Sequence, residues 1–337
     1  MPQWAGSCWY YMRYCDPGNT DRFISKEAEK YWSGTTDVSS AAGMVDLYVG
    51  GTEHAVLHLL YARFWHKVLH DLGHVSTIEP FQKLVNQGLI LGEDGAKMSK
   101  SIGNVVNPDD VVSEYGADSL RLYEMFMGPL EQVKPWQMKG VEGVSRFLAK
   151  VWRLAFEQNQ EGQWVLSSKL SDEQASTETH KDLLKVLHET IKKVSEDIER
   201  LSFNTAISQM MICTNAFGKA EQLPASLIRD LLKCLNPFAP HITEEINSQL
   251  PIANSKTMLC NQDWPTYNEA YLVEDEVEIV VQVNGKLRGK ITVAKDAAKD
   301  EIEALAQQDE NVIQHTEGKT IRKIIVVPGR LVNIVAN

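Results

Sequence analysis

The sequence predicts an α/β domain, followed by an all-α helical bundle and then a small α+β module. A short apolar run that ends in two glycines and precedes a segment of helical periodicity indicates the α/β part. The middle of the chain carries amphipathic helix patterns and almost no strand pattern, which is typical of a bundle. Near the end, Val and Ile alternate with polar residues around an Asn-Gly pair, the strongest short signal for a β-hairpin. The expected parts are an α/β domain over 1–140, a bundle over 141–250, a linker over 251–271 and a terminal module over 272–337.

The first region has the element order of a doubly wound α/β domain. The run "VDLYVGG" (45–51) predicts a buried strand, and the apolar spacing over 52–73 predicts one continuous helix. A second strand is expected within "LVNQGLIL" (84–91), and further helices are expected to begin at Pro108 and near Gly116. Strands that alternate with helices in this way favour a parallel sheet.

Simpler patterns define the bundle and the terminal module. Four segments of the bundle read as amphipathic helices: "VSRFLAKVWRLAFEQ", "HKDLLKVLHETIKKVSEDIERL", "NTAISQMMICTNAFGKAE" and "PASLIRDLLKCLNPFAPHITEEINSQL". The terminal module is expected to be β-β-α-β-β, with a hairpin at Asn284 and Gly285, a helix over 296–312 and two strands about Pro328 and Gly329.

Composition is that of an ordinary soluble globular protein, with 43% hydrophobic and 23% charged residues. There is no run of about 18 apolar residues, so no membrane partner is expected. The first residues do not read as a signal peptide, because no charged region precedes an apolar stretch. The five cysteines form no C-x-x-C pair, which favours reduced thiols over a zinc site. We therefore expect a cytoplasmic protein without a bound metal, or an organellar one if a longer form carries a transit peptide.

The segment "GLILGEDGAKMSKSIGN" (88–104) predicts an anion-binding loop. An apolar stretch ends at Gly92, Gly95 adds a second breaker, and Lys97 and Lys100 follow among small hydroxyl residues. Mobile cations on a flexible backbone suit a phosphate group. A solvated charged loop is the alternative interpretation.

The segment "GGTEH" that ends the first predicted strand is a second candidate site. Gly50 and Gly51 let a ligand approach the backbone at the edge where such sheets bind nucleotides. Glu53 is placed to accept hydrogen bonds from ribose hydroxyls. His54 and His58 are spaced i, i+4, on one face of the expected helix. From the residues alone, this pair fits a core feature as well as a ligand site, and we see no third metal ligand.

An ordered set of segments gives the chain a family resemblance over essentially its whole length. These segments are "AGSCWYYMRYCDP", "DLYVGGTEHAVLHLLYARFWHK", "LVNQGLILGEDGAKMSKSIGNVVNPDDVVSEYGADSLRLY", "FNTAIS" and "LNPFAPHITEE". In this order they resemble the C-terminal part of leucyl-tRNA synthetases, class I aminoacyl-tRNA synthetases of the bacterial or organellar type. The resemblance implies the second half of a Rossmann-type nucleotide fold, ATP-dependent activation of leucine, and transfer of leucine to tRNA(Leu).

The resemblance also implies a role for each candidate residue. Lys97 and Lys100 would stabilise negative charge on the α-phosphate of ATP, which arrives with Mg²⁺ as a substrate complex, while Ser99 and Ser101 would order the loop. Residues assigned to ATP or the adenylate are Gly50, Gly51, Glu53, His54, Gln87, Leu89, Ile90 and Met98. Residues assigned to leucine are Cys8, Tyr11, Tyr48, His54 and His58.

Some features depart from the family pattern. Cys8 stands where many relatives have a second serine, so its contact with leucine depends on that substitution. "HDLGH" (70–74) echoes the other class I signature, His-Ile-Gly-His, but it has one residue too many and reads as a helix end. By this resemblance, the half of the nucleotide fold that bears the true signature and the inserted editing domain are both missing from this sequence. Three alternatives stay open for the missing half: it belongs to a longer chain, it is encoded as a separate chain, or it is lost. The leucine-specific insertion before Lys97 of some relatives is also absent.

The resemblance assigns the bundle to binding of the tRNA anticodon and the terminal module to binding of the outer corner of the tRNA. The net charge is −11, so any contact with RNA must come from local cationic patches. In the terminal module these cations would be Lys286, Arg288, Lys290, Lys319, Arg322 and Lys323. Ordinary surface charge is the alternative for each of them, because the module also carries many acids.

Two alternative functions differ in what they require. A tRNA-binding protein derived from a synthetase but without catalysis would have no need of Lys97, Lys100, Glu53 and His54. A valyl- or isoleucyl-type relative would have Asp-Gln in place of Glu-His after the glycines and would not have this terminal module.

Overall fold

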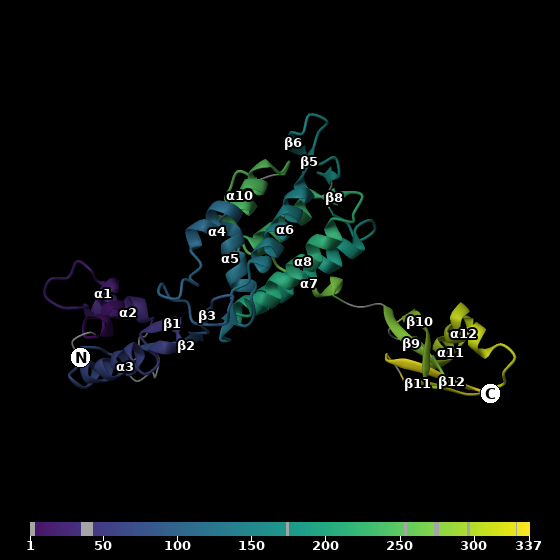
Figure 1. Cartoon of the computed structure of the whole chain (residues 1–337), viewed down its shortest axis with the longest axis horizontal. Helices are drawn as coiled ribbons and strands as arrows, with labels where there is room; N and C mark the ends of the chain where they lie inside the picture. The colour runs from purple at the N-terminus through teal and green to yellow at the C-terminus, as the bar shows by residue number, and fades with distance from the viewer. Residues whose placement is uncertain are drawn as a thin grey trace. The chain divides into compact units, whose positions relative to one another are not determined.

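The structure is a computed structural model, and it describes residues 4–34, 43–172, 175–252, 255–272, 276–294, 297–327 and 329–337. The chain divides into two compact units, Met1–Tyr267 and Asn268–Asn337 (Figure 1). Each unit has its own core, so each is described by itself. None of the helices in the described ranges has the length and apolarity that a membrane crossing requires.

The first unit begins with short helices around a small apolar core. They are η1 (Gly6–Cys8), α1 (Tyr10–Cys15) and α2 (Lys26–Ser33). Ser25 caps α2 by accepting a hydrogen bond from the Ala28 N–H, and Gly34 ends it at a φ of 64°. The buried members of this core are Tyr11, Met12, Ile24, Met44 and Val75.

Two parallel strands follow. The first of them confirms the strand predicted over 45–51, but the prediction that this strand is buried is wrong, because Leu47 and Val49 are 43% and 44% exposed. β1 (Val45–Gly51) pairs with β2 (Phe81–Gln87), so that Gly50 lies opposite Asn86 and Gly51 opposite Gln87. The second predicted strand is divided at Gly88, and the rest of it forms β3 (Ile90–Leu91). Gly88 lies so close to the Gln132 backbone that a Cβ atom there would overlap it.

The prediction of one helix over 52–73 is wrong. The chain forms a 3₁₀ turn, η2 (Thr52–His54), and only then α3 (His58–Asp71). Leu57 separates them with a φ of −114° and a ψ of −106°, outside the helical region. His54 therefore does not share a helix face with His58. The predicted helix end near His70 is confirmed, since α3 stops at Asp71.

Segments after β3 connect the sheet region to the bundle. β3 pairs in parallel with β4 (Lys134–Pro135). α4 (Pro108–Tyr115) begins at the predicted Pro108, and Asn107 caps it by accepting a hydrogen bond from the Asp109 N–H. α5 (Ala117–Phe126) follows Gly116, whose φ of 86° a residue with a side chain rarely adopts.

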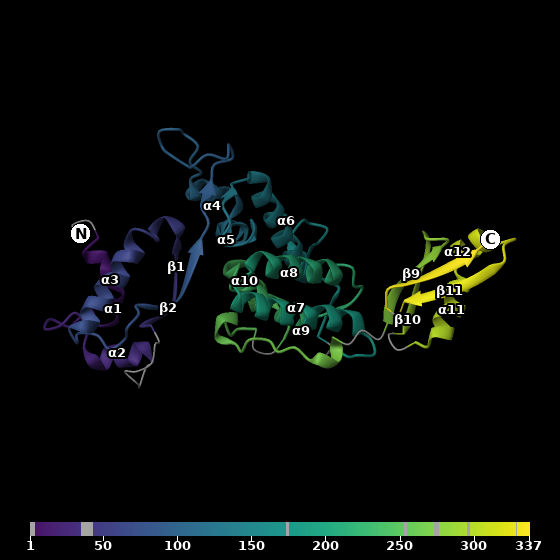
Figure 2. The ribbon, with the colours of Figure 1, turned by 90° about the horizontal axis from the view of Figure 1, so that it is seen from below.

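The bundle consists of long amphipathic helices whose apolar faces meet, and Figure 2 shows them side by side. Its helices are α6 (Met138–Ala155), α7 (Lys181–Glu199), α8 (Phe203–Phe217), α9 (Ala225–Leu235) and α10 (Pro240–Gln249). The fourth predicted helical segment is thus two helices, because Pro240 begins a new one. The bundle also carries short strands that the sequence did not predict: β5 (Phe156–Gln158), β6 (Trp164–Leu166), β7 (Leu170–Ser171) and β8 (Leu223–Pro224). One more turn, η3 (Leu259–Asn261), follows the bundle.

The second unit is a four-stranded sheet with helices packed on one face (Figure 1). After η4 (Glu269–Tyr271), its elements are β9 (Glu276–Val283), β10 (Lys286–Ala294), α11 (Lys299–Gln308), α12 (Glu310–Thr316), β11 (Ile321–Val327) and β12 (Leu331–Ala336). The strand order is β10-β9-β12-β11. The hairpin at Asn284 and Gly285 is confirmed, with positive φ at both residues.

The single helix predicted in this module is wrong, because Asp309 divides it. The backbone of Asp309 is extended, and its carboxylate accepts hydrogen bonds from the Asn311 and Val312 N–H groups, capping α12. Gly289 leaves the space for this cap, since a Cβ there would lie 2.6 Å from Asp309 Oδ1. The strands predicted about Pro328 form β11 and β12, and Pro328 itself lies outside the described residues.

Candidate functional site

The 97–101 loop lies at the end of a tight hairpin. Leu91 and Lys97 form an antiparallel bridge, and the Gly92 N–H donates to the Ala96 carbonyl at 2.9 Å. Gly95 takes the turn with a φ of 74°. Lys97 and Lys100 are exposed, and among the described residues no carboxylate lies within ion-pair distance of either ammonium. Both charges are thus available to an anion.

The backbone of this loop is ordered by its own polar side chains. Ser99 Oγ and Ser101 Oγ lie 2.7 Å apart, and the Ser99 carbonyl accepts hydrogen bonds from the Ile102 and Gly103 N–H groups. Asn104 also binds the loop backbone, and it in turn binds Asp94. Sequence reasoning assigned no role to Asn104 or Asp94, although a polar pair flanking a glycine-rich loop is a usable signal.

The glycines that end β1 lie beside the end of β2. A Cβ at Gly51 would overlap the Glu53 carboxylate, so this glycine lets Glu53 fold back over the strand end. Glu53 is exposed, and Gln87, the last residue of β2, lies opposite Gly51 in the strand register. Asn86, one residue earlier, has a buried Oδ1 atom without a hydrogen-bond partner among the described residues. A polar group of a ligand would satisfy it.

Two histidines and two tyrosines form a cluster next to these strands. Tyr10 Oη lies 2.6 Å from Tyr48 Oη, which lies 2.7 Å from His58 Nε2. The rings of His54 and His58 meet edge to face, 6.3 Å apart, and the Nδ1 atom of each is buried without a described partner. Burial, and then the neighbouring His54, lower the pKa of His58. The His58 imidazole is therefore neutral at neutral pH.

The other two residues assigned to leucine lie in the apolar core. Tyr11 is 6% exposed, and its hydroxyl lies 2.9 Å from Nδ1 of the buried His66. Cys8 is fully buried, and its thiol donates to the Trp4 carbonyl at 2.8 Å. Burial raises the pKa of both groups. Each side chain can support the site by packing. Its thiol or hydroxyl already has a hydrogen-bond partner within the protein, so neither side chain has a free polar atom to offer to a ligand.

The remaining residues assigned to ATP or the adenylate lie around the break between β2 and β3 and in the 97–101 loop. Gln87 and Ile90 line a hollow of about 370 Å³, and the Leu89 carbonyl accepts a hydrogen bond from the Lys134 N–H. Met98 is half-buried in the loop. The other residues around the hollow come from the turn before β3, from α5 and the segment after it, and from the region where α7 leads into α8: Gly88, Glu124, Met125, Gly128, Leu130, Leu201 and Phe203.

The six basic residues of the second unit, called the terminal unit below, differ in whether their charged groups have partners within it. Three of them have partners within the unit: Lys290 Nζ to Glu278 Oε1, Arg322 Nε to Asn337 Oδ1 and Lys319 Nζ to the His315 carbonyl, each at 2.7 Å. Lys286, Arg288 and Lys323 are exposed, and no described side chain pairs with their charged groups. Cations without partners are the ones that can bind phosphate without first losing an internal contact.

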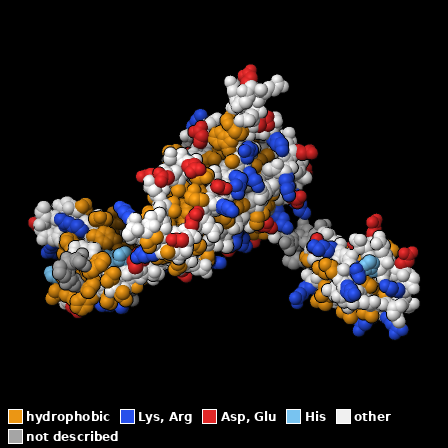
Figure 3. Space-filling model, viewed as in Figure 1, with side chains coloured by type: hydrophobic (Ala, Val, Ile, Leu, Met, Phe, Trp, Pro, Cys, Tyr) orange, Lys and Arg blue, Asp and Glu red, His pale blue; other side chains and the backbone are white. Residues whose placement is uncertain are grey.

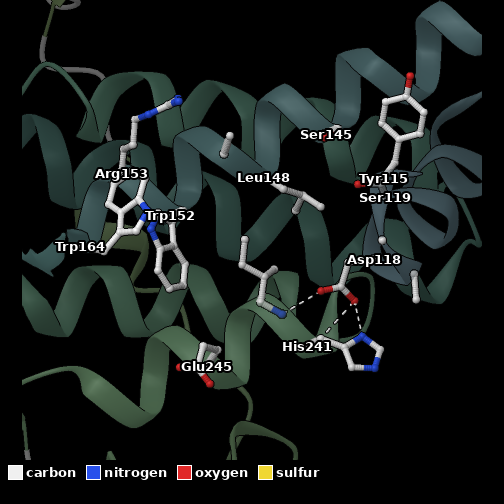
Figure 4. A pocket seen from close by; sticks show the side chains of 14 residues that line it. Tyr115, Asp118, Ser119, Ser145, Leu148, Trp152, Arg153, Trp164, His241 and Glu245 are labelled. Atoms are coloured by element: carbon white, nitrogen blue, oxygen red, sulfur yellow. Dashed lines mark hydrogen bonds and ion pairs between the residues drawn. The ribbon is translucent and has the colours of Figure 1, made fainter. Parts of the chain in front are cut away.

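A carboxylate joins α5 to α10 and so fixes the helices after the loop to the bundle. Asp118 accepts hydrogen bonds from the Ile242 N–H at 2.7 Å and from His241, through its N–H and its ring Nδ1 (Figure 4). A hollow of about 750 Å³ lies beside it, lined also by Tyr115 at the end of α4, by Trp152 and other residues of α6, and by Trp164 of β6. Two of the segments that carried the family resemblance meet here. The described residues include no cluster of three or more potential metal ligands.

Two protein-family models match the chain over the regions just described. The model for class I tRNA synthetases (I, L, M and V) matches residues 58–134, which contain α3, the 97–101 loop and α5. The model for the anticodon-binding domain of tRNA ligases matches residues 180–304, which contain the bundle from α7 onward. The chain therefore belongs to the class I tRNA synthetase family.

Within that family, the chain is similar to a leucyl-type structure. It is 32% identical to the LeuRS of Agrobacterium radiobacter K84, solved as a ternary complex with tRNA and LeuAMS, with a TM-score of 0.69. The match covers 98% of this chain and 42% of that one, so the chain spans less than half of the length of this relative. It is also similar to the Mycobacterium tuberculosis methionyl-tRNA synthetase solved with methionyl-adenylate, at 17% identity and a TM-score of 0.52, covering 76% of this chain and 51% of that one. The second likeness shows the fold alone.

Proposed function

We propose that the chain is the part of a leucyl-tRNA synthetase that presents the phosphate-facing loop and binds tRNA(Leu). The observation that carries this proposal is the exposed pair Lys97 and Lys100, which lack acidic partners in the described structure and stand on a hydrogen-bonded loop. The similarity to a LeuRS over nearly the whole chain supports the choice of leucine. A merely solvated loop would not need an ordered backbone.

The proposed reaction requires cations at this place. A carboxylate oxygen of leucine attacks the α-phosphorus of ATP, and the bond from that phosphorus to pyrophosphate breaks. Negative charge grows on the phosphate oxygens in the transition state, and preorganised cations aimed at them are worth more there than in the ground state. Lys97 and Lys100 would stabilise this charge, with ATP entering as its Mg²⁺ complex. Ser99 and Ser101 would hold the loop in shape.

The ends of β1 and β2 would hold the rest of the adenylate. Glu53 would accept hydrogen bonds from the ribose, with Gln87 near the adenine. His54 and His58 would contact leucine through ring nitrogens that have no described partner in the chain. Tyr48 fixes the His58 ring by its hydrogen bond to Nε2. These assignments are supported by the buried polar atoms around the strand ends, which are costly to leave unsatisfied.

The terminal unit and the bundle would bind tRNA(Leu). Support comes from the anticodon-binding family match and from the tRNA in the complex of the similar LeuRS. Lys286, Arg288 and Lys323 are the cations most available for phosphate contacts, since each is exposed and has no described partner.

We also propose that the β1 and β2 pair packs against a further sheet-forming segment. Parallel strands are ordinarily covered on both faces, yet Leu47, Val49 and Leu84 are each more than 40% exposed. On α3, Leu60 and Phe64 are 56% and 61% exposed, and Figure 3 shows hydrophobic side chains gathered on this part of the surface. The segment that would cover them is the N-terminal half of the nucleotide fold, in the same protein or as a separate chain.

A two-part enzyme tests the proposal. This chain would be combined, by fusion or co-expression, with the N-terminal portion of the Agrobacterium LeuRS up to the start of the match, and leucine-dependent pyrophosphate exchange would be measured. Lys100→Ala should lower the exchange rate about 100- to 1,000-fold, the usual effect of removing one preorganised transition-state contact, with little change in leucine binding. Lys139→Ala, which removes an exposed lysine of α6, is the matched control.

The outcomes separate the candidate functions. An unchanged exchange rate in Lys100→Ala would show that the role of the loop is wrong. A two-part enzyme that binds tRNA(Leu) but catalyses no leucine-dependent exchange would favour the non-catalytic tRNA-binding function. Exchange that depends on valine or isoleucine would replace leucine as the substrate.

A further inference from the structure

We infer that Asp94 and Asn104 are positioning residues that clasp the two ends of the 97–101 loop and thereby set where Lys97 and Lys100 point. This inference rests on the proposed function of that loop and adds two residues to it. Neither residue needs to touch the nucleotide. Their contribution is to fix the backbone from which the cations extend.

The Asn104 side chain joins three parts of the loop. Its Oδ1 atom accepts a hydrogen bond from the Ser99 N–H at 2.9 Å. Its Nδ2 atom lies 3.2 Å from both carboxylate oxygens of Asp94 and 3.4 Å from the Lys97 carbonyl. The amide therefore holds the backbone on both sides of Met98 and ties it to the start of the hairpin. An amide can do this because it offers an acceptor and two donors at once.

Asp94 completes the clasp and is held in its ionised form. Its Oδ1 also accepts a hydrogen bond from the Ala96 N–H at 3.0 Å. That bond, and then the bond from Asn104, lower the pKa of Asp94 below its ordinary value. A carboxylate here has no described cation as a partner and faces an amide instead, so it does not neutralise Lys97 or Lys100.

Gly92 leaves the space in which the clasp closes. A Cβ atom at this position would lie 2.7 Å from Asp94 Oδ1 and 2.9 Å from Asn104 Nδ2. Both distances are shorter than real Cβ contacts, so a side chain here would push the two partners apart. Gly92, Asp94 and Asn104 thus pack together, although they come from different parts of the loop. The side chains of Lys97 and Lys100, which lie between them in the sequence, take no part in this contact.

Exchanging the clasp partners tests the inference in the chain by itself. Asn104→Asp places two carboxylates against each other and removes the donor to Asp94. Adding Asp94→Asn restores the contact with the donor and acceptor exchanged. The amide introduced at position 94 can donate a hydrogen bond to the carboxylate introduced at position 104, and its oxygen can still accept the bond from the Ala96 N–H. Asn159→Ala is the matched control, because Asn159 orders a different turn through its bonds from the Glu161 and Gln163 N–H groups.

Limited trypsin digestion measures directly how readily the loop opens, because trypsin cleaves after Lys97 and Lys100. We expect cleavage at these two bonds to be at least about tenfold faster in Asn104→Asp, the effect of losing one to two net hydrogen bonds, and to return to within about threefold of wild type in the double variant. Cleavage after Lys150, in α6, should not change and serves as the internal control for global unfolding. Wild-type cleavage in Asn104→Asp, or a double variant as fast as the single one, would overturn the clasp.

The two-part enzyme then tests the positioning role. Leucine-dependent pyrophosphate exchange should fall about tenfold in kcat for Asn104→Asp and recover in the double variant, while KM for leucine stays the same. A clasp that opens in the protease assay without any fall in kcat would make it structural only and refute the positioning role. If the wild-type two-part enzyme shows no exchange, the proposed function fails, and the order of cleavage rates still decides whether the clasp exists.

Discussion

Replacing His66 should remove a pH-dependent part of the stability of the first unit. His66 is 0% exposed, and both of its ring nitrogens are bound. Nε2 lies 2.9 Å from the Thr77 carbonyl, which can only accept, so Nε2 carries the proton and Nδ1 accepts from the Tyr11 hydroxyl at 2.9 Å. Burial lowers the pKa of His66 from 6.5 to about 4. The folded protein therefore keeps this imidazole neutral.

The magnitude follows from the difference in proton binding between the folded and unfolded states. Above pH 6.5 neither state is protonated at His66 and the group makes no pH-dependent contribution. Between pH 6.5 and about 4 the unfolded chain binds a proton that the folded chain excludes, so stability falls as the pH falls. At about pH 5 this loss amounts to about 2 kcal/mol in the free energy of unfolding.

Urea unfolding of wild type and His66→Gln, near pH 7.5 and near pH 5, measures this loss. Glutamine does not titrate, so the packing cost of the substitution is the same at both pH values and cancels in the comparison. We expect wild type to lose about 2 kcal/mol more than His66→Gln on going to the lower pH. His74→Gln, which replaces an exposed imidazole, should behave like wild type. Parallel losses in wild type and His66→Gln would refute the buried, neutral state of His66.

Three further predictions concern other parts of the chain. Asp118→Asn should lower the free energy of unfolding by about 1–2 kcal/mol in urea titrations, because α10 loses a charged cap, and an unchanged midpoint would contradict this role. In the isolated unit 268–337, Lys286→Ser with Arg288→Ser should flatten the log–log salt dependence of tRNA binding by about one to two units, whereas the same slope in the variant would make these cations ordinary surface charge. Gly285→Ala should destabilise that unit by about 1 kcal/mol in thermal unfolding, since the hairpin turn needs its φ of 78°, and an unchanged melting temperature would argue against that turn.

The sequence predicted well those features that short segments decide. The strand over 45–51, the helix start at Pro108 and the hairpin at Asn284 are set by glycine, proline and the alternation of side chains within a few residues. Lys97 and Lys100 stood out for the same reason, because the cations and their glycines are adjacent in the chain. The family likeness used these local segments in order, and the comparisons confirm the family.

Only the tertiary structure decided which distant residues meet. Whether 52–73 forms one helix depended on the non-helical turn at Leu57, which the apolar spacing did not reveal. Tyr11 lies in the core, where its hydroxyl meets His66, 55 positions later in the chain. Asp118 and Ile242 meet across 124 positions, and Asp94 meets Asn104 across the loop. Local sequence sets backbone preference over a few residues, whereas side-chain hydrogen bonds and burial between distant segments exist only once the chain has packed.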